Sequence, residues 1–324
     1  MPTFRPSLPK TLVAAILVLG SSLAFAQDTF PSRALRIVVP FTPGGSTDML
    51  ARIIAKGLEE NLKQPVVVDN KPGAGGSIGA AMVAKSAPDG YTLLLTSSSL
   101  STNAAIQTNL PFDTLKDLKA VAIFATAPFV MVVNNDMPVR TPRELVDEML
   151  RHPGKYAYAS AGPGSTNHFA TELIKSATGA SVVHVPYRGA VPAMTDLVAG
   201  RVHMTLATLP SLSQYIAAGR VRAIGITSPG PSPIAPQLSA FSTAIPGFDF
   251  EQWFGLLTTA GTPEAVVARL HAEINRVTSR QDFKDLLHRE GARERTATPT
   301  EFGQLIAAEI SRLQQVAREQ DIRP

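Results

Sequence analysis

The chain has no cysteine among its 324 residues. This absence excludes disulfides, a thiol nucleophile, thiolate metal sites and a lipid anchor on cysteine. Charged residues are also scarce, at 17 % with a formal net charge of +4, so there is no basic stripe for nucleic acid. Aromatic residues make up only 6 %, but 44 % of the chain is hydrophobic, which suffices for one or two packed cores. We expect a folded protein that binds no nucleic acid.

The first 26 residues have the pattern of a secretory signal peptide. Arg5 and Lys10 form a basic start, an apolar run follows over 12–19, and Ala24-Phe25-Ala26 is a small-x-small cleavage motif. The apolar run is shorter than the roughly 20 residues that a membrane-spanning helix requires. We therefore expect export with cleavage after Ala26, and we exclude residues 1–26 from the fold.

Strand-like runs alternate with amphipathic stretches along the rest of the chain. The first half has strand patterns at 36–39, 65–69 and 91–95, separated by helical patterns at 49–58 and 77–85. The same order returns in the second half, with strands at 156–160, 182–185 and 202–207 and helices at 167–177 and 192–199. Crossovers of this length join parallel strands. The sequence therefore predicts an α/β protein in which one βαβαβ unit occurs twice.

Further strand-like stretches indicate how the two units are connected. They lie at 121–124 and 129–133 between the units, and at 221–226 and 253–258 after the second unit. Amphipathic helices follow to the end of the chain, and their apolar stripes are explained by packing. We expect two lobes joined by crossover strands, with lobe one over 27–134 plus 254–324 and lobe two over 135–253.

Each unit has a glycine-rich loop between its first strand and its first helix. Gly45-Ser46-Thr47-Asp48 in lobe one matches Gly164-Ser165-Thr166-Asn167 in lobe two. Open α/β sheets bind ligands at this end of their strands. A helix N-terminus offers unpaired N–H groups and a partial positive charge, which hold a carboxylate or phosphate without Lys or Arg. Each loop alone is explained by helix capping, with Ser46 or Thr47 as the lobe-one cap, but two loops facing one cleft favour an anion site.

Other polar residues near these loops are candidates for the same cleft. Thr96-Ser97-Ser98-Ser99 follows the third strand and offers hydroxyls to the cleft, and Thr208 follows the corresponding strand of lobe two. His168 lies in the first helical turn after the lobe-two loop, where it either contacts a ligand or packs and caps the helix. A third glycine-rich segment, 71–77, also leads into a helix and is either an anion site or a turn.

Catalytic and metal-binding patterns find little support. Gly75-Gly76-Ser77-Ile78-Gly79 fits the G-x-S-x-G motif, but Ser77 does not follow a strand directly, as a nucleophile elbow requires. The six histidines form no metal-ligand pattern, and neither a P-loop nor a G-x-G-x-x-G after a strand is present. We expect no enzymatic activity, no cofactor and no metal. A secreted serine hydrolase that uses Ser77 is the alternative.

Several motifs together resemble the Bug family, the solute-binding proteins of tripartite tricarboxylate transporters. The segment 39–48 resembles the opening signature of that family. Five further stretches agree in the same order: 68–76, 88–92, Gly164-Ser165 with His168, 184–189 and 253–256. The resemblance covers essentially the whole chain after the signal peptide.

The resemblance implies a two-lobed periplasmic binding protein of type II that closes on a small organic carboxylate and delivers it to a tripartite membrane permease. We expect a monomer; a binding protein that signals to a receptor is the alternative. Ala207-Thr208 stands where relatives usually have Asp-Asn, so the identity of the ligand is not carried over. Asp48 is expected to orient Ser46 or a water. The candidate ligand-binding residues are Phe41, Gly44, Gly45, Ser46, Asp48, Ser97, Ser98, Ser160, Gly164, Ser165, His168, Thr208 and Trp253.

Overall fold

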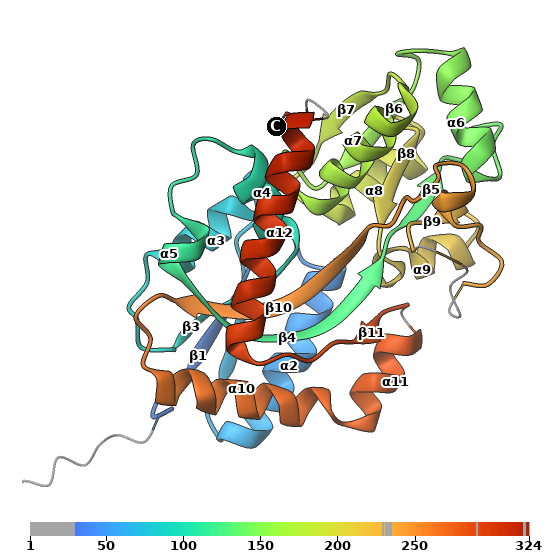
Figure 1. Ribbon diagram of the computed structural model, residues 1–324. Helices are drawn as coiled ribbons and strands as arrows, with labels where there is room; N and C mark the ends of the chain where they lie inside the picture. Colours follow the sequence, from blue (N-terminus) through green and yellow to red (C-terminus); the bar gives the residue numbers. More distant parts are fainter. Residues whose placement is uncertain (1–29, 229, 231–234, 290, 320–321, 324) are drawn as a thin grey trace, which may run out of the picture. The chain divides into compact units, whose positions relative to one another are not determined.

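The computed structural model describes residues 30–228, 230, 235–289, 291–319 and 322–323, and the expected signal peptide lies outside them. The chain from Arg33 onward forms one compact unit, and the fold below is that of this unit. Helices and strands alternate along this unit, and the strands form two sheets that are flanked by the helices (Figure 1). Among the described residues, none of the helices has the length and apolarity that crossing a membrane would need.

The elements follow the chain in three groups. The first comprises β1 Leu35–Val39, α2 Ser46–Leu62, β2 Val66–Asn70, η1 Ala74–Gly76, α3 Ser77–Ala84, β3 Thr92–Ser97, α4 Ser99–Ile106, α5 Thr114–Asp117 and β4 Leu118–Pro128. The second comprises β5 Val130–Val133, α6 Pro142–Arg151, β6 Ala157–Ser160, α7 Thr166–Thr178, β7 Val183–Pro186, α8 Ala190–Val198, β8 Met204–Ala207, α9 Leu209–Ala217, β9 Arg222–Ile226 and η2 Phe241–Thr243. The third comprises β10 Glu251–Thr259, α10 Glu264–Thr278, α11 Gln281–Arg289, β11 Arg293–Glu294 and α12 Pro299–Glu319.

The two sheets repeat one strand order. The six-stranded sheet has the order β11-β4-β10-β3-β1-β2, and the five-stranded sheet has the order β7-β6-β8-β5-β9. In the first, β1 pairs in parallel with β2 and β3; in the second, β6 pairs in parallel with β7 and β8. The predicted repeat of a parallel βαβαβ unit is therefore confirmed.

Each sheet also takes one antiparallel strand from a crossover of the chain. Strand β5 follows β4 directly but inserts between β8 and β9 of the other sheet, and β10 inserts between β3 and β4. From this pairing we propose that the chain enters lobe two between Pro128 and Val130, slightly ahead of the predicted boundary at 134. It returns to lobe one before Glu251, slightly ahead of the predicted boundary at 253.

The C-terminal helix α12 contributes to the hydrophobic cores of both lobes. Phe302, Ile306 and Ile310 pack in a core with strands of the six-stranded sheet. One to two turns later, Leu313 and Ala317 pack in a core with strands of the five-stranded sheet. The predicted apolar stripe of this helix is confirmed, because an i, i+4 spacing keeps these side chains on one face.

Phe302 is a direct test of this packing. Its ring is fully buried, meets Trp253 edge-on with centroids 5.0 Å apart, and covers Gly255. We expect Phe302→Ala to lower the free energy of unfolding by about 3–5 kcal/mol, because it leaves a cavity between α12 and β10. Chemical denaturation followed by circular dichroism measures this change. Leu115→Ala is the control, since that side chain is 52 % exposed. A loss no larger than that of the control would contradict the role of α12.

Candidate functional site

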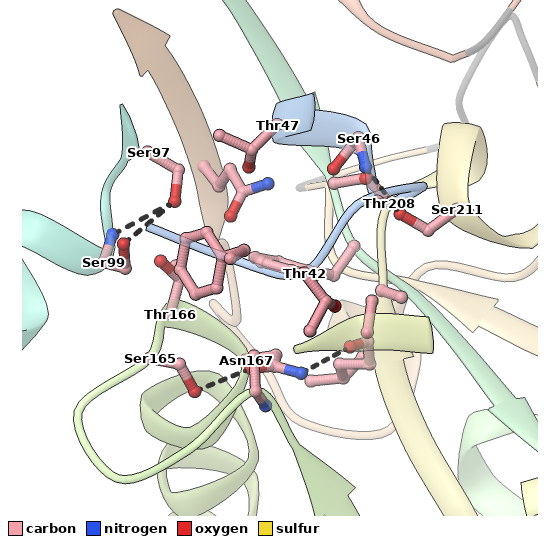
Figure 2. A pocket seen from close by; sticks show the side chains of 18 residues that line it. Thr42, Ser46, Thr47, Ser97, Ser99, Ser165, Thr166, Asn167, Thr208 and Ser211 are labelled. Atoms are coloured by element: carbon pink, nitrogen blue, oxygen red, sulfur yellow. Dashed lines mark hydrogen bonds between the residues drawn. The ribbon is translucent and has the colours of Figure 1, made fainter. Parts of the chain in front are cut away.

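A cavity lies at the two glycine-rich loops that the sequence indicates (Figure 2). Its volume is about 60 Å³. One water needs roughly 10–15 Å³ of such space, so the cavity has room for several waters or a small solute. Eighteen residues line it: Phe41, Thr42, Gly45, Ser46, Thr47, Ser97, Ser99, Phe129, Ala161, Ser165, Thr166, Asn167, Ala190, Leu206, Ala207, Thr208, Ser211 and Gln252.

The lining combines hydroxyl and amide groups with a few apolar side chains, and none of the lining residues is charged. Six of the thirteen candidate residues lie here, namely Phe41, Gly45, Ser46, Ser97, Ser165 and Thr208. The other seven lie outside the lining. The part that each of the thirteen plays in ligand binding remains a prediction.

Five helices begin at the cavity. Ser46, Ser99, Thr166 and Ala190 are the first residues of α2, α4, α7 and α8, and Thr208 is the N-cap of α9. Each helix N-terminus has about half a positive charge. Because all five face the same space, their partial charges favour an anion there even though no Lys or Arg lines the cavity.

The prediction that Ser46 or Thr47 caps α2 is wrong. The helix already begins at Ser46, so its N-cap is Gly45, which has no side chain that could accept a hydrogen bond. The amide of Ser46 instead donates across the cavity to Ser211 Oγ at 3.2 Å. Helix α7 also lacks a side-chain cap, since its N-cap Ser165 has its Oγ near Gly162 O and Asn167 Oδ1. Neither α2 nor α7 is therefore capped by the side chain of its own N-cap residue.

Three buried hydroxyls in the lining have no partner. The Oγ1 atoms of Thr42, Thr166 and Thr208 make no hydrogen bond to any described residue. Leaving a buried polar group unpaired costs about 1–3 kcal/mol. Such a cost at three positions around one cavity is expected where a ligand or ordered water supplies the missing partners. Figure 2 shows that these hydroxyls come from separate segments around the cavity.

Gly44 and Asp48 lie behind the cavity and fix the lobe-one loop. Asp48 is buried and accepts hydrogen bonds from Gly44 N, Arg52 Nε and Asn70 Nδ2, each at 3.0 Å. Burial opposes ionisation, but these hydrogen bonds outweigh it and hold the pKa of Asp48 below its ordinary value. Asp48 therefore orients the loop backbone; the expectation that it orients Ser46 is not what the contacts show.

Ser160, Gly164 and His168 belong to a buried network behind the lobe-two loop. His168 Nδ1 accepts from Gly164 N at 3.3 Å, and Ser160 Oγ accepts from Gly162 N at 3.1 Å. Ser160 Oγ is also 2.6 Å from Nε2 of His184, whose ring stacks on His168. Burial lowers the pKa of His168, and burial together with His168 lowers the pKa of His184 to about 4. The packing role left open for His168 is thus the one its contacts show.

Ser98 and Trp253 support the serine segment that lines the cavity. Ser98 Oγ accepts from Trp253 N at 2.9 Å, which leaves Ser97 and Ser99 beside it to face the cavity. The indole Nε1 of Trp253 donates to Glu309 Oε2 at 2.7 Å, away from the cavity. Trp253 therefore contacts this segment through its own backbone amide, which donates to the Ser98 side chain, and not through its ring.

Twelve of the lining residues are not among the thirteen candidates. Some lie next to predicted residues, and the match between the two loops already included Thr47, Thr166 and Asn167. Ser211 and Gln252 had no local signal, because they reach the cavity only through α9 and through the start of β10. The other seven are Thr42, Ser99, Phe129, Ala161, Ala190, Leu206 and Ala207.

The alternative nucleophile Ser77 is not supported. It is the first residue of α3 and is buried, and no histidine among the described residues hydrogen bonds to it. Among the residues that the structure describes, no cluster of three or more His, Asp or Glu side chains is arranged to hold a metal ion.

The two lobes touch beside the cavity. Gln107 Nε2 donates to Pro163 O at 2.9 Å, and Thr102 Oγ1 donates to Gly164 O. Gly75, in the third glycine-rich segment, lies against the same loop: a Cβ atom on it would be 2.1 Å from Pro163 O. The segment left open as an anion site or a turn thus forms a tight turn against the opposite lobe.

Two sheets of matching strand order, exchanged crossover strands and a polar cavity at the helix N-termini between them define a two-lobed solute-binding protein. The chain matches the tripartite tricarboxylate transporter family receptor over residues 50–322, and it belongs to that family. This confirms the resemblance to the Bug proteins.

Relatives and solved structures agree. The chain is 36 % identical to BugT of Bordetella pertussis over 307 residues, which is 94 % of each chain. It is similar to the solved R. palustris protein Rpa4515 with adipate, with 33 % identity and a TM-score of 0.87 over 91 % of this chain and 99 % of that one. It is also similar to MatC from Rhodopseudomonas palustris with bound malate, with 31 % identity and a TM-score of 0.84 over 89 % and 99 %.

Contact between the lobes can be tested at Gly75. We expect Gly75→Ala to weaken solute binding at least about tenfold, because the new methyl group would push Pro163 of the opposite lobe away. A tenfold change in affinity corresponds to a loss of only about 1.4 kcal/mol of binding free energy. Isothermal titration calorimetry measures the affinity. Gly154→Ala is the matched control, because Gly154 also has a positive φ but has nothing within 4 Å. Equal affinities of the two variants would contradict the role of this contact.

Proposed function

We propose that this protein binds a small organic carboxylate in the cavity between its lobes. The observation that carries the proposal is the set of three unpartnered hydroxyls, of Thr42, Thr166 and Thr208, where five helix N-termini meet. Hydroxyls and amides donate hydrogen bonds to carboxylate oxygens, and helix N-termini stabilise negative charge. The adipate and malate named for the two solved neighbours are acids of this class.

Binding and closure are coupled in this proposal. Thr42 and the start of α2 belong to lobe one, whereas Thr166 and Thr208 belong to lobe two. A carboxylate that contacts both sets stabilises the closed arrangement, because only that arrangement brings all of these donors within reach. Among the described residues, the chain passes between the sheets where β4 leads into β5 and where β10 begins, and α12 packs in the cores of both lobes, so closure needs changes in few places.

The wider role follows from the family. We propose that the protein acts in the periplasm after cleavage of its signal peptide, works as a monomer without enzymatic activity, and delivers its ligand to a tripartite membrane permease. The family description, which names a transporter receptor, favours a permease over a signalling receptor as the partner.

A charge placed at Gly45 tests the site. Gly45 has an ordinary φ of −83°, and a Cβ atom there would only touch Ala190 at 3.9 Å, so a side chain fits without backbone strain. We expect Gly45→Asp to abolish carboxylate binding, because its negative charge would occupy the anion site. The melting temperature should hold or rise, since Asp is a good N-cap. The control is Gly45→Asn, which has the same shape and no charge. A thermal-shift screen of mono-, di- and tricarboxylates identifies the ligand first, and equal binding by the two variants would refute the site.

The uncharged lining also predicts selectivity. An ammonium group would find no carboxylate among the lining residues and would meet five positive helix ends. We therefore expect the α-amino analogue of any bound acid to bind at least about tenfold more weakly, because a buried ion without a partner costs several kcal/mol. Displacement by succinate and L-aspartate, or by glutarate and L-glutamate, measures this ratio. Comparable affinities within a pair would show that the cavity accepts cations.

A further inference from the structure

A second and larger cavity lies beside the crossover strand β10, on the side of α12. Its volume is about 360 Å³, within the range of small-molecule sites. On one side, the lining residues are Phe250, just before β10, and Glu251 and Trp253 in β10. The other lining residues include Arg295, which follows β11, and two residues of α12, Glu309 and Arg312. We call this space the crossover cavity. Nothing in the proposed function uses it.

Three carboxyl groups line the crossover cavity, those of Asp249, Glu251 and Glu309. Glu251 Oε1 is buried and makes no hydrogen bond to the described residues, while its other oxygen accepts from Arg293 Nη2. Glu309 Oε2 accepts from the neutral indole N–H of Trp253 at 2.7 Å. Burial raises the pKa of both carboxyls; the Arg293 guanidinium lowers it less at Glu251, and hydrogen bonds to the carboxylate lower it less at Glu309. A cationic group would find an acceptor ready at Glu251.

Two arginines and two apolar side chains are also part of the lining. Arg295 and Arg312 are exposed, and neither forms an ion pair with a described residue. Phe250 is buried, and Leu305 on α12 is half-buried, so together they offer an apolar surface. A ligand that matches all of these groups has an ammonium, a carboxylate and a short apolar body.

We propose that the crossover cavity is a second ligand site, for a small amphipathic zwitterion of the α-amino-acid type. Its ammonium group donates to Glu251 Oε1, its carboxylate faces Arg295 and Arg312, and its apolar body packs against Phe250 and Leu305. This chemistry is the opposite of that of the first cavity, whose lining has no charged side chain. The two sites are therefore expected to take different molecules.

The position of this site gives it a means to affect the first one. Gln252 lines both cavities, and the next residue, Trp253, holds Ser98 in the segment whose neighbours line the first cavity. Trp253 is also the only tryptophan of the chain and lines the crossover cavity. Its fluorescence is therefore a built-in reporter of occupancy there.

Three probes that share one branched carbon skeleton test the proposal on the purified protein. They are L-leucine, 3-methylbutylamine, which lacks the carboxylate, and 4-methylpentanoate, which lacks the amine. We expect L-leucine to change the Trp253 fluorescence saturably, with a calorimetric affinity at least about tenfold above either analogue, since each analogue leaves charged groups unpaired. No saturable change, or equal affinities of the three probes, would overturn the proposal.

Two variants locate the binding. Glu251→Gln keeps the shape of the side chain and removes its charge, so it should weaken L-leucine binding at least about tenfold. Glu264→Gln, an exposed Glu on α10, is the control and should leave the affinity unchanged. Gly45→Asp alters only the first cavity and should also leave it unchanged. If Gly45→Asp abolishes the L-leucine response while Glu251→Gln retains it, L-leucine occupies the first cavity and the second site is refuted. Arg312→Gln, at an exposed position, repeats the test should Glu251→Gln fail to fold.

Discussion

The binding cavity depends on helix N-termini that have no side-chain cap. A capping Ser, Thr, Asn or Asp contributes about 1 kcal/mol to a helix, and α2 and α7, whose first residues both line the cavity, have no such bond from their own N-cap residues. The unpaired hydroxyls of Thr42, Thr166 and Thr208 add a further cost at the same place. The unliganded site is thus held in a polar state that an anion can satisfy. In the proposed site, helix dipoles favour negative charge without any charged side chain in the lining.

Such a site needs loops whose backbones do not relax, and each lobe holds its loop with a buried acceptor. In lobe one, Asp48 accepts from the amide of Gly44 and is itself held by Arg52 and Asn70. In lobe two, the neutral imidazole of His168 accepts from the amide of Gly164. Different side chains perform the same task four residues after the glycine. Asp48 and His168 are thus not among the lining residues, and their contacts are with the loop backbones.

This explains how far the sequence could predict the site. The repeat of the βαβαβ unit and the two loops follow from hydrophobic periodicity and glycine spacing, which are local. Whether a polar residue near such a loop faces the ligand or supports the backbone depends on the turn conformation, so Asp48 and His168 could not be distinguished from Ser46 and Ser165. Helix α6 could have been predicted, because Thr141 and Glu144 flank its start in a capping pattern. The positions of Ser211 and Gln252 at the cavity could not have been predicted, since tertiary contacts alone bring them there.

The exchange of crossover strands links the ligand site to the stability of the whole fold. Strand β10 inserts into the six-stranded sheet immediately after Gln252 reaches the cavity, and its next residue, Trp253, packs on Phe302 of α12. Helix α12 in turn belongs to the cores of both lobes. Helix α12 and β10 meet where Phe302 packs on Trp253, and the crossover cavity is lined by residues of both elements. A molecule bound there would contact both a crossover strand and the helix that packs in the cores of both lobes, so we propose that its chemistry bears on closure as well as on packing.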